Sequence, residues 1–355
     1  MKIEKRGMIE MSVVKTTGFG IIGCGIIAEV HAKGILETDE ARLIGVYDSI
    51  QTKAVDFAKK YQVISFSSLE EMLHNDEIDV ICICTPSGIH PEQTVQVAKA
   101  KKHILVEKPM AIKMDDYSRM VEACEENNVL ISTVFPRRMS PQAQFARKII
   151  QEGKLGRLSL CSGYVKIYRD QHYYDSAGWR GTWEMDGGGA MMNQGIHTVD
   201  MLQWLVGPVA SLYGKAKAVL RDIEVEDTVI SLLEFKNGAM GVLEITTTAF
   251  EGKGQVLSIH GEKGTLVIQE DTITVLEVEG EKIEIPSFEP FKVIPDGHRI
   301  QIKDMALAVQ EQRSPIVPGT EGKHSLEIIL GTYESSTTGK EVSFLHDLKS
   351  KAQIL

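Results

Sequence analysis

The sequence lacks the features of a secreted or membrane-spanning protein. It has only five cysteines among 355 residues, and no two of them form a C-x-x-C pair. Such cysteine usage favours free thiols in a reducing, cytoplasmic compartment over a disulfide framework. No apolar run approaches the roughly 20 residues that a membrane helix needs. Residues 1–17 carry charges without a sustained apolar core, so we read no signal peptide there and expect a disordered leader.

Positive charge is also scarce. The chain has 39 Lys and Arg against 49 Asp and Glu, which gives a formal net charge of −10. Proteins that bind nucleic acid or an anionic membrane usually present a basic face, so we expect neither partner. The composition, 43% hydrophobic and 25% charged, is that of an ordinary globular protein, and the length allows two domains.

A glycine-rich turn follows the first apolar run, within residues 18–32, GFGIIGCGIIAEVHA. Gly23, Gly25 and Ala28 fit the dinucleotide-binding pattern G-x-G-x-x-G/A. Gly23 permits a tight turn, Gly25 permits close approach of a pyrophosphate, and Ala28 permits close helix–strand packing. By itself, the pattern is equally typical of a strand–turn–helix unit that packs tightly and binds nothing.

Two further features suit a nucleotide at this turn. The backbone of Ile26 and Ile27 opens a helix, whose free N–H groups favour phosphate. Asp48 ends the next strand, twenty positions beyond Ala28, where a carboxylate can bind the ribose diol. No arginine follows Asp48 to hold a 2′-phosphate, which favours NAD over NADP, although Lys53 is close in sequence.

The order of apolar runs predicts two domains. Strands alternate with helices up to about residue 135, which indicates a doubly wound parallel α/β sheet of the Rossmann type at 18–138. Short strands without intervening helices then predict an open, predominantly antiparallel sheet flanked by helices, in an α+β substrate-binding and oligomerisation domain at 139–355. We expect the last helix to pack back on the first domain. Helices are predicted at 114–127, 190–206, 298–311 and 321–338.

Two loops should border the cofactor, because ligands of parallel sheets bind at the carboxyl ends of the strands. The first holds Thr85, Pro86 and His90, of which His90 suits a helix start or packing better than catalysis. The second holds Glu107 and Lys108, followed by a proline. Burial at such a strand end lowers the pKa of a lysine and makes it a usable proton donor or acceptor. An exposed loop lysine is the simpler alternative.

The densest stretch of candidate chemistry is DGGGAMMNQGIHTVD, residues 186–200. Asn193, His197 and Asp200 follow the glycines at i, i+4 and i+7, on one face of the predicted helix. His197 can act as a general base, with Asn193 and Asp200 in support. A satisfied core histidine is the alternative for any single His. We expect no metal, because no second histidine stands at ligand spacing.

The loop 168–186 is long and aromatic. Its Arg169 and Arg180 can bind hydroxyls, a carboxylate or a phosphate, and its Tyr174 and Trp179 can stack on a sugar. We therefore expect the substrate to contact these four residues together with Asn193 and His197. A packed loop between subunits would show the same composition.

Together these motifs resemble the Gfo/Idh/MocA family of oxidoreductases over nearly the whole chain. The resemblance rests on GIIGCGIIAEVHA, on EKPMA and on GGGAMMNQGIHTVD. It implies a Rossmann domain joined to a sheet domain that often mediates oligomerisation, a catalytic role for Lys108 and His197, and a cis peptide before Pro109. Asn193 departs from the aspartate of inositol dehydrogenase-like members. WRGTWEMDGGGAMMNQGIH is also similar to the branch that oxidises UDP-N-acetylglucosaminuronic acid at C3.

The sequence thus predicts an NAD-dependent dehydrogenase, active on a secondary hydroxyl of a sugar, sugar derivative or cyclitol. The nucleotide-sugar uronate is one candidate substrate, and the chain is expected to form a dimer or tetramer through its C-terminal sheet. Lys108 and His197 both remain candidates for the base. Two alternatives stay open: an NADPH-dependent keto-sugar reductase, and a regulatory protein that senses NAD without turnover. The sequence does not choose the sugar, the carbon or the direction.

Overall fold

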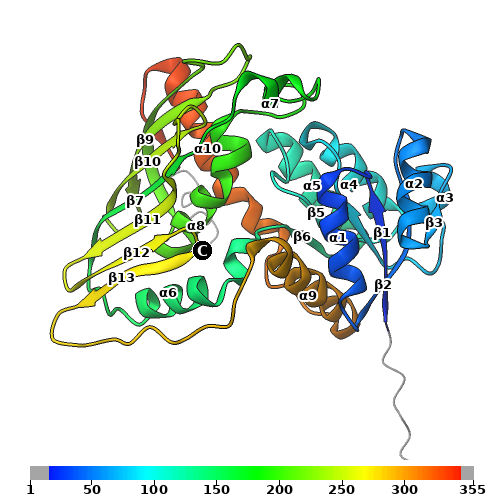
Figure 1. Ribbon diagram of the computed structural model, residues 1–355, viewed down its shortest axis with the longest axis horizontal. Coiled ribbons are helices and arrows are strands. Elements are labelled where there is room, and N and C mark those ends of the chain that lie inside the picture. Colours follow the sequence, from blue (N-terminus) through cyan, green and yellow to red (C-terminus); the bar gives the residue numbers. More distant parts are fainter. Residues whose placement is uncertain (1–15, 345–355) are drawn as a thin grey trace, which may run out of the picture.

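The computed structural model describes residues 16–344, so all but the last two residues of the predicted leader lie outside the described part. The first sheet has six strands in the order β3-β2-β1-β4-β5-β6, and all of them are parallel, as the sequence predicts (Figure 1). It begins at Thr17, one residue earlier than expected, because Thr17 pairs with Ala41 and is buried. Its strands are β1 (Thr17–Ile22), β2 (Ala41–Tyr47), β3 (Ile64–Ser65), β4 (Val80–Ile83), β5 (His103–Val106) and β6 (Ile131–Thr133).

Helices connect these strands and cover both faces of the sheet. They are α1 (Ile26–Leu36), α2 (Gln51–Tyr61), α3 (Leu69–Leu73), the short η1 (Ser87–Ile89), α4 (His90–Lys99) and α5 (Met114–Asn127). The strand order reverses between β1 and β4, which is the switch point where ligands of such sheets bind. The fold therefore places the glycine turn, β4 and β5 along one candidate binding edge.

The second sheet has eight strands in the order β13-β12-β11-β7-β10-β9-β8-β14. All its neighbours are antiparallel except β7 and β10, so the predicted open, mostly antiparallel sheet is confirmed. Its strands are β7 (Leu158–Lys166), β8 (Val209–Lys217), β9 (Thr228–Phe235), β10 (Met240–Thr246), β11 (Gly254–Gly261), β12 (Gly264–Gln269), β13 (Thr272–Val278) and β14 (Val342–Ser343).

The helical elements of the second half lie between the two sheets and beside the first one (Figure 1). They are η2 (Pro136–Met139), α6 (Pro141–Gln151), α7 (Gln171–Asp175), η3 (Ala190–Gly195), α8 (Ile196–Val206), η4 (Val293–Gly297), α9 (His298–Glu311), η5 (Gly319–Glu321) and α10 (Gly322–Thr338). Helices α8 and α10 pack on the inner face of the large sheet, toward the Rossmann domain.

The chain returns to the first sheet well before its last helix. Helix α9 packs on α1 and β1, where the Thr17 hydroxyl donates to the Ala306 carbonyl at 3.1 Å. The Gln301 amide donates to the Thr133 carbonyl at 3.0 Å, which ties α9 to the end of β6. The start of α10 also lies beside α5. Three separate stretches of the chain therefore hold the Rossmann domain against the second domain.

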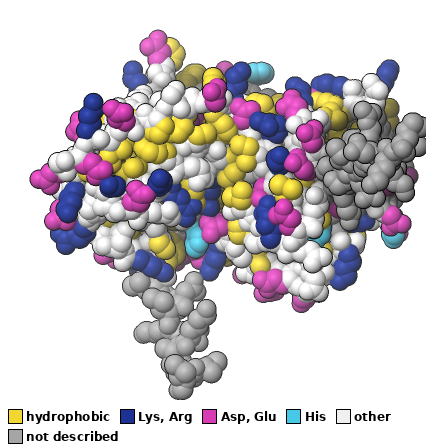
Figure 2. Space-filling model, turned by 90° about the horizontal axis from the view of Figure 1, so that it is seen from below, with side chains coloured by type: hydrophobic (Ala, Val, Ile, Leu, Met, Phe, Trp, Pro, Cys, Tyr) yellow, Lys and Arg dark blue, Asp and Glu magenta, His cyan; other side chains and the backbone are white. Residues whose placement is uncertain are grey.

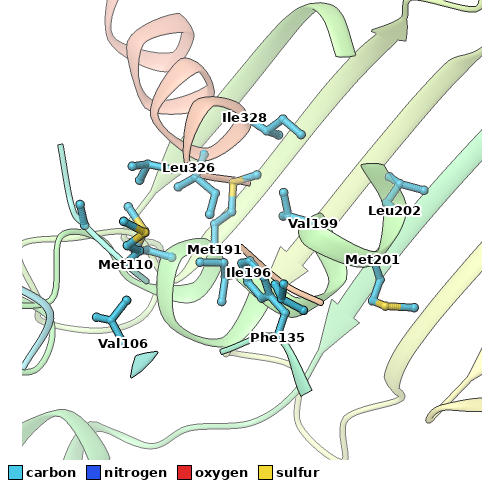
Figure 3. Packing of buried hydrophobic residues seen from close by; sticks show 14 of the residues in the cluster. Val106, Met110, Phe135, Met191, Ile196, Val199, Met201, Leu202, Leu326 and Ile328 are labelled. Atoms are coloured by element: carbon cyan, nitrogen blue, oxygen red, sulfur yellow. The ribbon is translucent and has the colours of Figure 1, made fainter. Parts of the chain in front are cut away.

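A shared apolar core lies beneath the candidate site (Figure 3). Val106 reaches it from β5, Phe135 from the segment after β6, and Met191 and Ile196 from η3 and α8, while Leu326 reaches it from α10. All five side chains are at most 2% exposed. Burying one side chain of this size contributes about 2 kcal/mol to stability. The shared core therefore holds the two domains in a fixed geometry. None of the described helices combines the length and apolar character needed to cross a membrane.

Candidate active site

The glycine turn between β1 and α1 has the shape that a dinucleotide requires. Gly23 has φ +90°, and a Cβ there would lie 2.9 Å from the Cys84 carbonyl oxygen. At Gly25 a Cβ would meet nothing within 4 Å, so the backbone faces open space. Gly25 is the N-cap of α1 and no side chain caps it, which leaves the N–H groups at Ile26 and Ile27 for a ligand. The Ile26 side chain is 84% exposed at this edge.

Asp48 lies beside the turn, at the end of β2. Its Oδ2 accepts the Cys24 N–H at 2.8 Å, and its Oδ1 accepts the Ile50 N–H at 2.8 Å. The two bonds fix the carboxylate against the glycine turn. Each oxygen keeps lone pairs that can accept further hydrogen bonds, so the geometry suits a ribose diol.

The loop after β4 borders the same turn, but its residues differ in what they offer. The Thr85 hydroxyl donates to Gln93 Oε1 at 2.6 Å, and Pro86 precedes η1. His90 is buried, and its two ring nitrogens lie 2.9 and 3.0 Å from the carbonyl oxygens of Thr85 and Pro109. His90 was expected to bind the cofactor, but both of its polar atoms are occupied. It instead ties the loop after β4 to the loop after β5.

Glu107 also points away from the expected ligand. Its Oε1 lies 2.8 Å from His31 Nε2 and 3.4 Å from His298 Nε2. Burial alone would raise the pKa of Glu107, but the hydrogen bonds from His298 and His31 hold it well below its ordinary value. Successive residues of an extended chain face opposite sides, so Glu107 enters the core where Lys108 faces the site. The expectation that Glu107 binds the cofactor is therefore replaced by a role in joining α1, β5 and α9.

This histidine–glutamate cluster has the residue types of a metal site. The Nδ1 atoms of both His31 and His298 are buried without a hydrogen-bond partner. Metal-bound histidines usually donate the other ring N–H to a second group. Donation of Nε2–H from each histidine to the one carboxylate explains the contacts without an ion.

Lys108 lies at the centre of the site. Its Nζ donates to the backbone oxygen of Asn193 at 2.9 Å, so the end of β5 contacts η3 of the second domain. Burial lowers the pKa of Lys108, and the negative charges of Glu107 and Asp186 oppose that shift. The Lys108–Pro109 peptide is cis, as the family resemblance implied.

His197 follows one turn after Asn193, but the helix there is not regular. Residues Ala190–Gly195 form a π-helical turn before α8, a distortion that is frequent at functional sites. Burial, with the positive charges of Lys108 and Arg137, holds the pKa of His197 well below its ordinary value. Its ring packs edge-on to Phe135 at 6.4 Å, and Nδ1 is buried without a partner. The ring is therefore neutral near pH 7 and can accept a proton.

Asp200 does not support His197 directly. Both of its carboxylate oxygens accept from Arg138, with Nε–Oδ2 at 2.8 Å and Nη2–Oδ1 at 2.6 Å. Arg138 also donates to Glu321 at 2.7 Å. Asp200 is 1% exposed, and Arg138 is 3% exposed. The expectation of catalytic support is corrected here: Asp200 belongs to a buried ion pair that joins η2, α8 and the start of α10.

The loop 168–186, which we call the substrate loop, places both of its arginines beside Tyr173, whereas one of the aromatic residues expected to bind substrate is buried. Tyr174 was expected to bind substrate, but it is buried and its hydroxyl lies 2.8 Å from the Thr247 hydroxyl. Tyr173 is the partly exposed ring instead, flanked by the guanidinium groups of Arg169 at 5.0 Å and Arg180 at 4.4 Å. Arg180 also lies 5.0 Å from the ring centre of Trp179.

These two arginines form a positive patch. Neither Arg169 nor Arg180 makes a salt bridge with a carboxylate of the described chain. The Nε atoms of both are buried without a hydrogen-bond partner. In a chain with a net charge of −10, such a patch suits a negatively charged ligand group.

The sequence interpretation missed one buried acid of the site. Asp186 accepts a hydrogen bond from Asn193 Nδ2 at 2.9 Å and another from the Gly181 N–H at 3.0 Å. An acid placed directly before three glycines was the available signal, because the glycines allow its neighbours to approach closely. Asn193 contacts both Lys108 and Asp186, so it joins the loop after β5 to the loop 168–186.

Two hollows of the described surface are not lined by Lys108 or His197. One is lined by Arg137, Thr198 and Asp271, and another by Trp183, Glu226 and Tyr333. The candidate site therefore rests on contacts between named residues rather than on an enclosed cavity.

Family comparisons agree with the architecture. Residues 17–135 match the oxidoreductase family with an NAD-binding Rossmann fold, and residues 143–267 match the GFO/IDH/MocA C-terminal domain. Myo-inositol 2-dehydrogenase from Thermotoga maritima is 25% identical over 86% of this chain and 92% of its own.

Solved structures show a higher similarity. The WlbA dehydrogenase from Bordetella pertussis, crystallised with NADH and UDP-GlcNAcA, is 34% identical with a TM-score of 0.85, over 93% of this chain and 99% of its own. The Chromobacterium violaceum WlbA dehydrogenase, crystallised with the same ligands, is 32% identical with a TM-score of 0.85, over 95% of this chain and 98% of its own.

Proposed function

Because the chain belongs to the GFO/IDH/MocA oxidoreductase family, we propose that it is an NAD-dependent dehydrogenase of a sugar that carries negative charge. The observation that carries the proposal is the hydrogen bond from Lys108 to Asn193, with the charge of Lys108 acting on His197. The next residue, Gln194, donates to Tyr173, which lies between the guanidinium groups of the positive patch. The same sites in neutral-sugar and cyclitol enzymes would not need that patch. A UDP-sugar uronate, oxidised at C3, is the specific substrate that we propose.

The cofactor site fits NAD. The open backbone at Gly25 and the uncapped start of α1 suit the pyrophosphate, and Asp48 suits the ribose diol. NAD, when bound, supplies the hydride acceptor for the reaction. The negative charge of Asp48 disfavours a 2′-phosphate, so NADP is the poorer cofactor.

Two side chains act on the substrate hydroxyl in this proposal. Lys108 donates to the hydroxyl oxygen and stabilises the negative charge that develops there; burial lowers its pKa, and the nearby carboxylates oppose that shift. His197 is neutral, and the Nδ1 of its ring is buried without a hydrogen-bond partner, so the ring can accept the hydroxyl proton. This assignment makes His197 the base and Lys108 the electrostatic partner.

We also propose a homo-oligomer built on the outer face of the large sheet. Strands β7 to β10 expose the large apolar side chains of Leu160, Tyr213, Ile230, Leu232 and Met240 there. In a view from below, hydrophobic side chains gather in a band over the lobe of this sheet (Figure 2). All five cysteines are free thiols, which suits a cytoplasmic enzyme.

The test is NADH formation at 340 nm with UDP-sugar uronates, neutral UDP-sugars, hexoses and inositols. We expect turnover with a UDP-sugar uronate, and a kcat/KM lower by about 10²- to 10³-fold in Lys108→Ala and in His197→Ala. Lys113→Ala is the matched control, because this exposed lysine lies five residues further on and its side chain makes no described contact. All variants should still bind NADH.

The pH profile adds a second readout. Activity should persist below pH 6.5, because burial depresses the pKa of His197, and should fall at high pH as Lys108 loses its proton. Unchanged turnover in both alanine variants would refute the proposed roles. NAD binding without turnover on any sugar would favour a sensor, and faster reduction of a keto-sugar with NADPH would favour a reductase.

A further inference from the structure

Asp186 is a buried carboxylate with no role in the reaction as proposed above. The residue is 3% exposed, and both of its oxygens accept hydrogen bonds, from Asn193 Nδ2 at 2.9 Å and from the Gly181 N–H at 3.0 Å. Burying such a charge is costly unless donors and positive charge surround it. The positive charges that act on it are those of Lys108 and Arg180.

A single residue joins this acid to Lys108. Asn193 accepts the Lys108 ammonium through its backbone oxygen at 2.9 Å and donates its side-chain amide to Asp186. The chain of contacts therefore runs from the loop after β5, through η3, to the substrate loop. Asp186 makes no hydrogen bond of its own to Lys108, so any effect on the chemistry passes through Asn193 and through the charge of the carboxylate.

We propose that Asp186 is a positioning residue of the active site, which orients the Asn193 amide and places a compensating negative charge near Lys108. The inference rests on the proposed dehydrogenase function of the same site. Position 193 is an asparagine and carries no charge. The buried carboxylate of the second domain that opposes the positive charge of Lys108 is therefore that of Asp186, seven residues earlier.

The orientation of Asn193 follows from hydrogen-bond chemistry. An ionised carboxylate only accepts, so the Asn193 NH₂ group must face Asp186. The Asn193 Oδ1 then points elsewhere, and it has no partner among the described residues. Asn193 can thereby accept a hydrogen bond from a substrate hydroxyl next to the one that Lys108 and His197 hold.

Other charged residues also act on Lys108, Asp186 and His197. Glu107 acts on Lys108 from the preceding residue, and Arg180 acts on Asp186 from the substrate loop. His197 is influenced by Lys108, Arg137 and Glu107, and by His298 from α9. Only Asp186 among these acids contacts Asn193, so its removal is a specific test.

The experiment compares Asp186→Asn with wild type, using a UDP-sugar uronate and NAD. We expect kcat to fall about tenfold or more, because the amide loses its fixed orientation, while the KM for NAD stays unchanged. The high-pH limb of the profile should move down by about one pH unit, because Lys108 loses a stabilising negative charge. Glu184→Gln is the control: it removes the same charge from an exposed position two residues away.

A second variant exchanges the two side chains. Asp186→Asn with Asn193→Asp returns a carboxylate to the site, so it should move the high-pH limb back toward the wild-type position. It also keeps the proposal testable if Asp186→Asn alone fails to fold, as judged by circular dichroism and NADH binding. An exchanged protein that folds but keeps the lowered limb would overturn the proposal.

Failure of this inference is distinguishable from failure of the proposed function. If Asp186→Asn retains the wild-type kcat and pH profile while Lys108→Ala and His197→Ala lose activity, Asp186 has no positioning role and the dehydrogenase assignment stands. If Lys108→Ala and His197→Ala are also unaffected, the site itself has been assigned wrongly. A loss of activity equal to that of Glu184→Gln would likewise overturn the role of Asp186.

Discussion

At the scale of single residues, we expect Asp48 to determine which cofactor the glycine turn accepts. Its carboxylate is oriented by the N–H groups of Cys24 and Ile50, so it meets a ribose in a fixed geometry. Asp48→Asn keeps the size of the side chain, removes its charge and leaves one of the two N–H groups without an acceptor, because an amide NH₂ only donates. We expect the KM for NAD to rise about tenfold, since a hydrogen bond to a charged group contributes about 1.5 kcal/mol or more.

The same change should alter the cofactor preference. Without the carboxylate, a 2′-phosphate is no longer repelled, so the ratio of kcat/KM for NAD over NADP should fall. Asp39→Asn is the matched control, because this exposed aspartate follows the opposite end of α1. A preference ratio that Asp48→Asn leaves at the wild-type value would contradict the ribose role.

Single residues also show where interpretation of the sequence was limited. Lys108 and Asn193 could be placed because each stands in a short motif with a defined position in the fold. The orientation of Glu107, His90 and Tyr174 could not be predicted, since it depends on partners that are remote in sequence. Asp186 was missed for the same reason: its contacts become visible only when η3 folds back on the substrate loop.

At the scale of elements, strong hydrophobic periodicity predicted the bounds of several helices correctly. The predicted ranges 114–127 and 298–311 coincide with α5 and α9, and 321–338 differs from α10 by one residue. The predicted helix 190–206 is divided into a π-helical turn and α8, because hydrogen bonds from Gly189 and Met191 to the buried Glu226 hold its start. Strand β8 was not predicted, since Gly214 and three lysine or tyrosine positions interrupt its apolar pattern.

The buried pair of Arg138 and Asp200 is the contact that most clearly joins elements of both domains. Asp200→Asn should lower the free energy of unfolding by about 3–5 kcal/mol, because it leaves the Arg138 charge buried with one fewer partner. The measurement is the midpoint of urea or thermal unfolding. The partly exposed pair Asp116–Arg119 on α5 is the control, and Asp116→Asn should cost less than about 1 kcal/mol.

The same variant separates a structural role from a catalytic one. If Asp200 serves only the ion pair, folded Asp200→Asn protein should keep a pH profile like that of wild type at low temperature. If the low-pH limb of the activity profile moves in Asp200→Asn while the unfolding midpoint stays unchanged, Asp200 does support His197 in catalysis.

At the scale of the whole molecule, the two sheets have different relations to their surroundings. Helices cover both faces of the Rossmann sheet, whereas α8 and α10 pack on the inner face of the large sheet (Figure 1). On its outer face, apolar side chains lie next to one another across the strands. Leu232 of β9 is paired with Val242 of β10 on one side and Tyr213 of β8 on the other, and Met240 is paired with Leu160.

A continuous apolar surface of this kind is best explained by a second copy of the chain. Leu232 is 54% exposed and Ile230 is 53% exposed, on an interior strand of the sheet rather than at its edge.

Leu232→Glu would bury a charge in the proposed interface, and truncation or charge at an interface centre typically weakens association by more than tenfold. We expect light scattering after gel filtration to show a dimer or tetramer for wild type and a smaller species for Leu232→Glu. Val55→Glu on α2, which changes a similarly exposed residue of the other domain, should leave the mass unchanged. Since the active site lies on the inner side of this sheet, the monomeric variant should retain NAD binding, and a wild-type protein that is already monomeric at micromolar concentration would refute the interface.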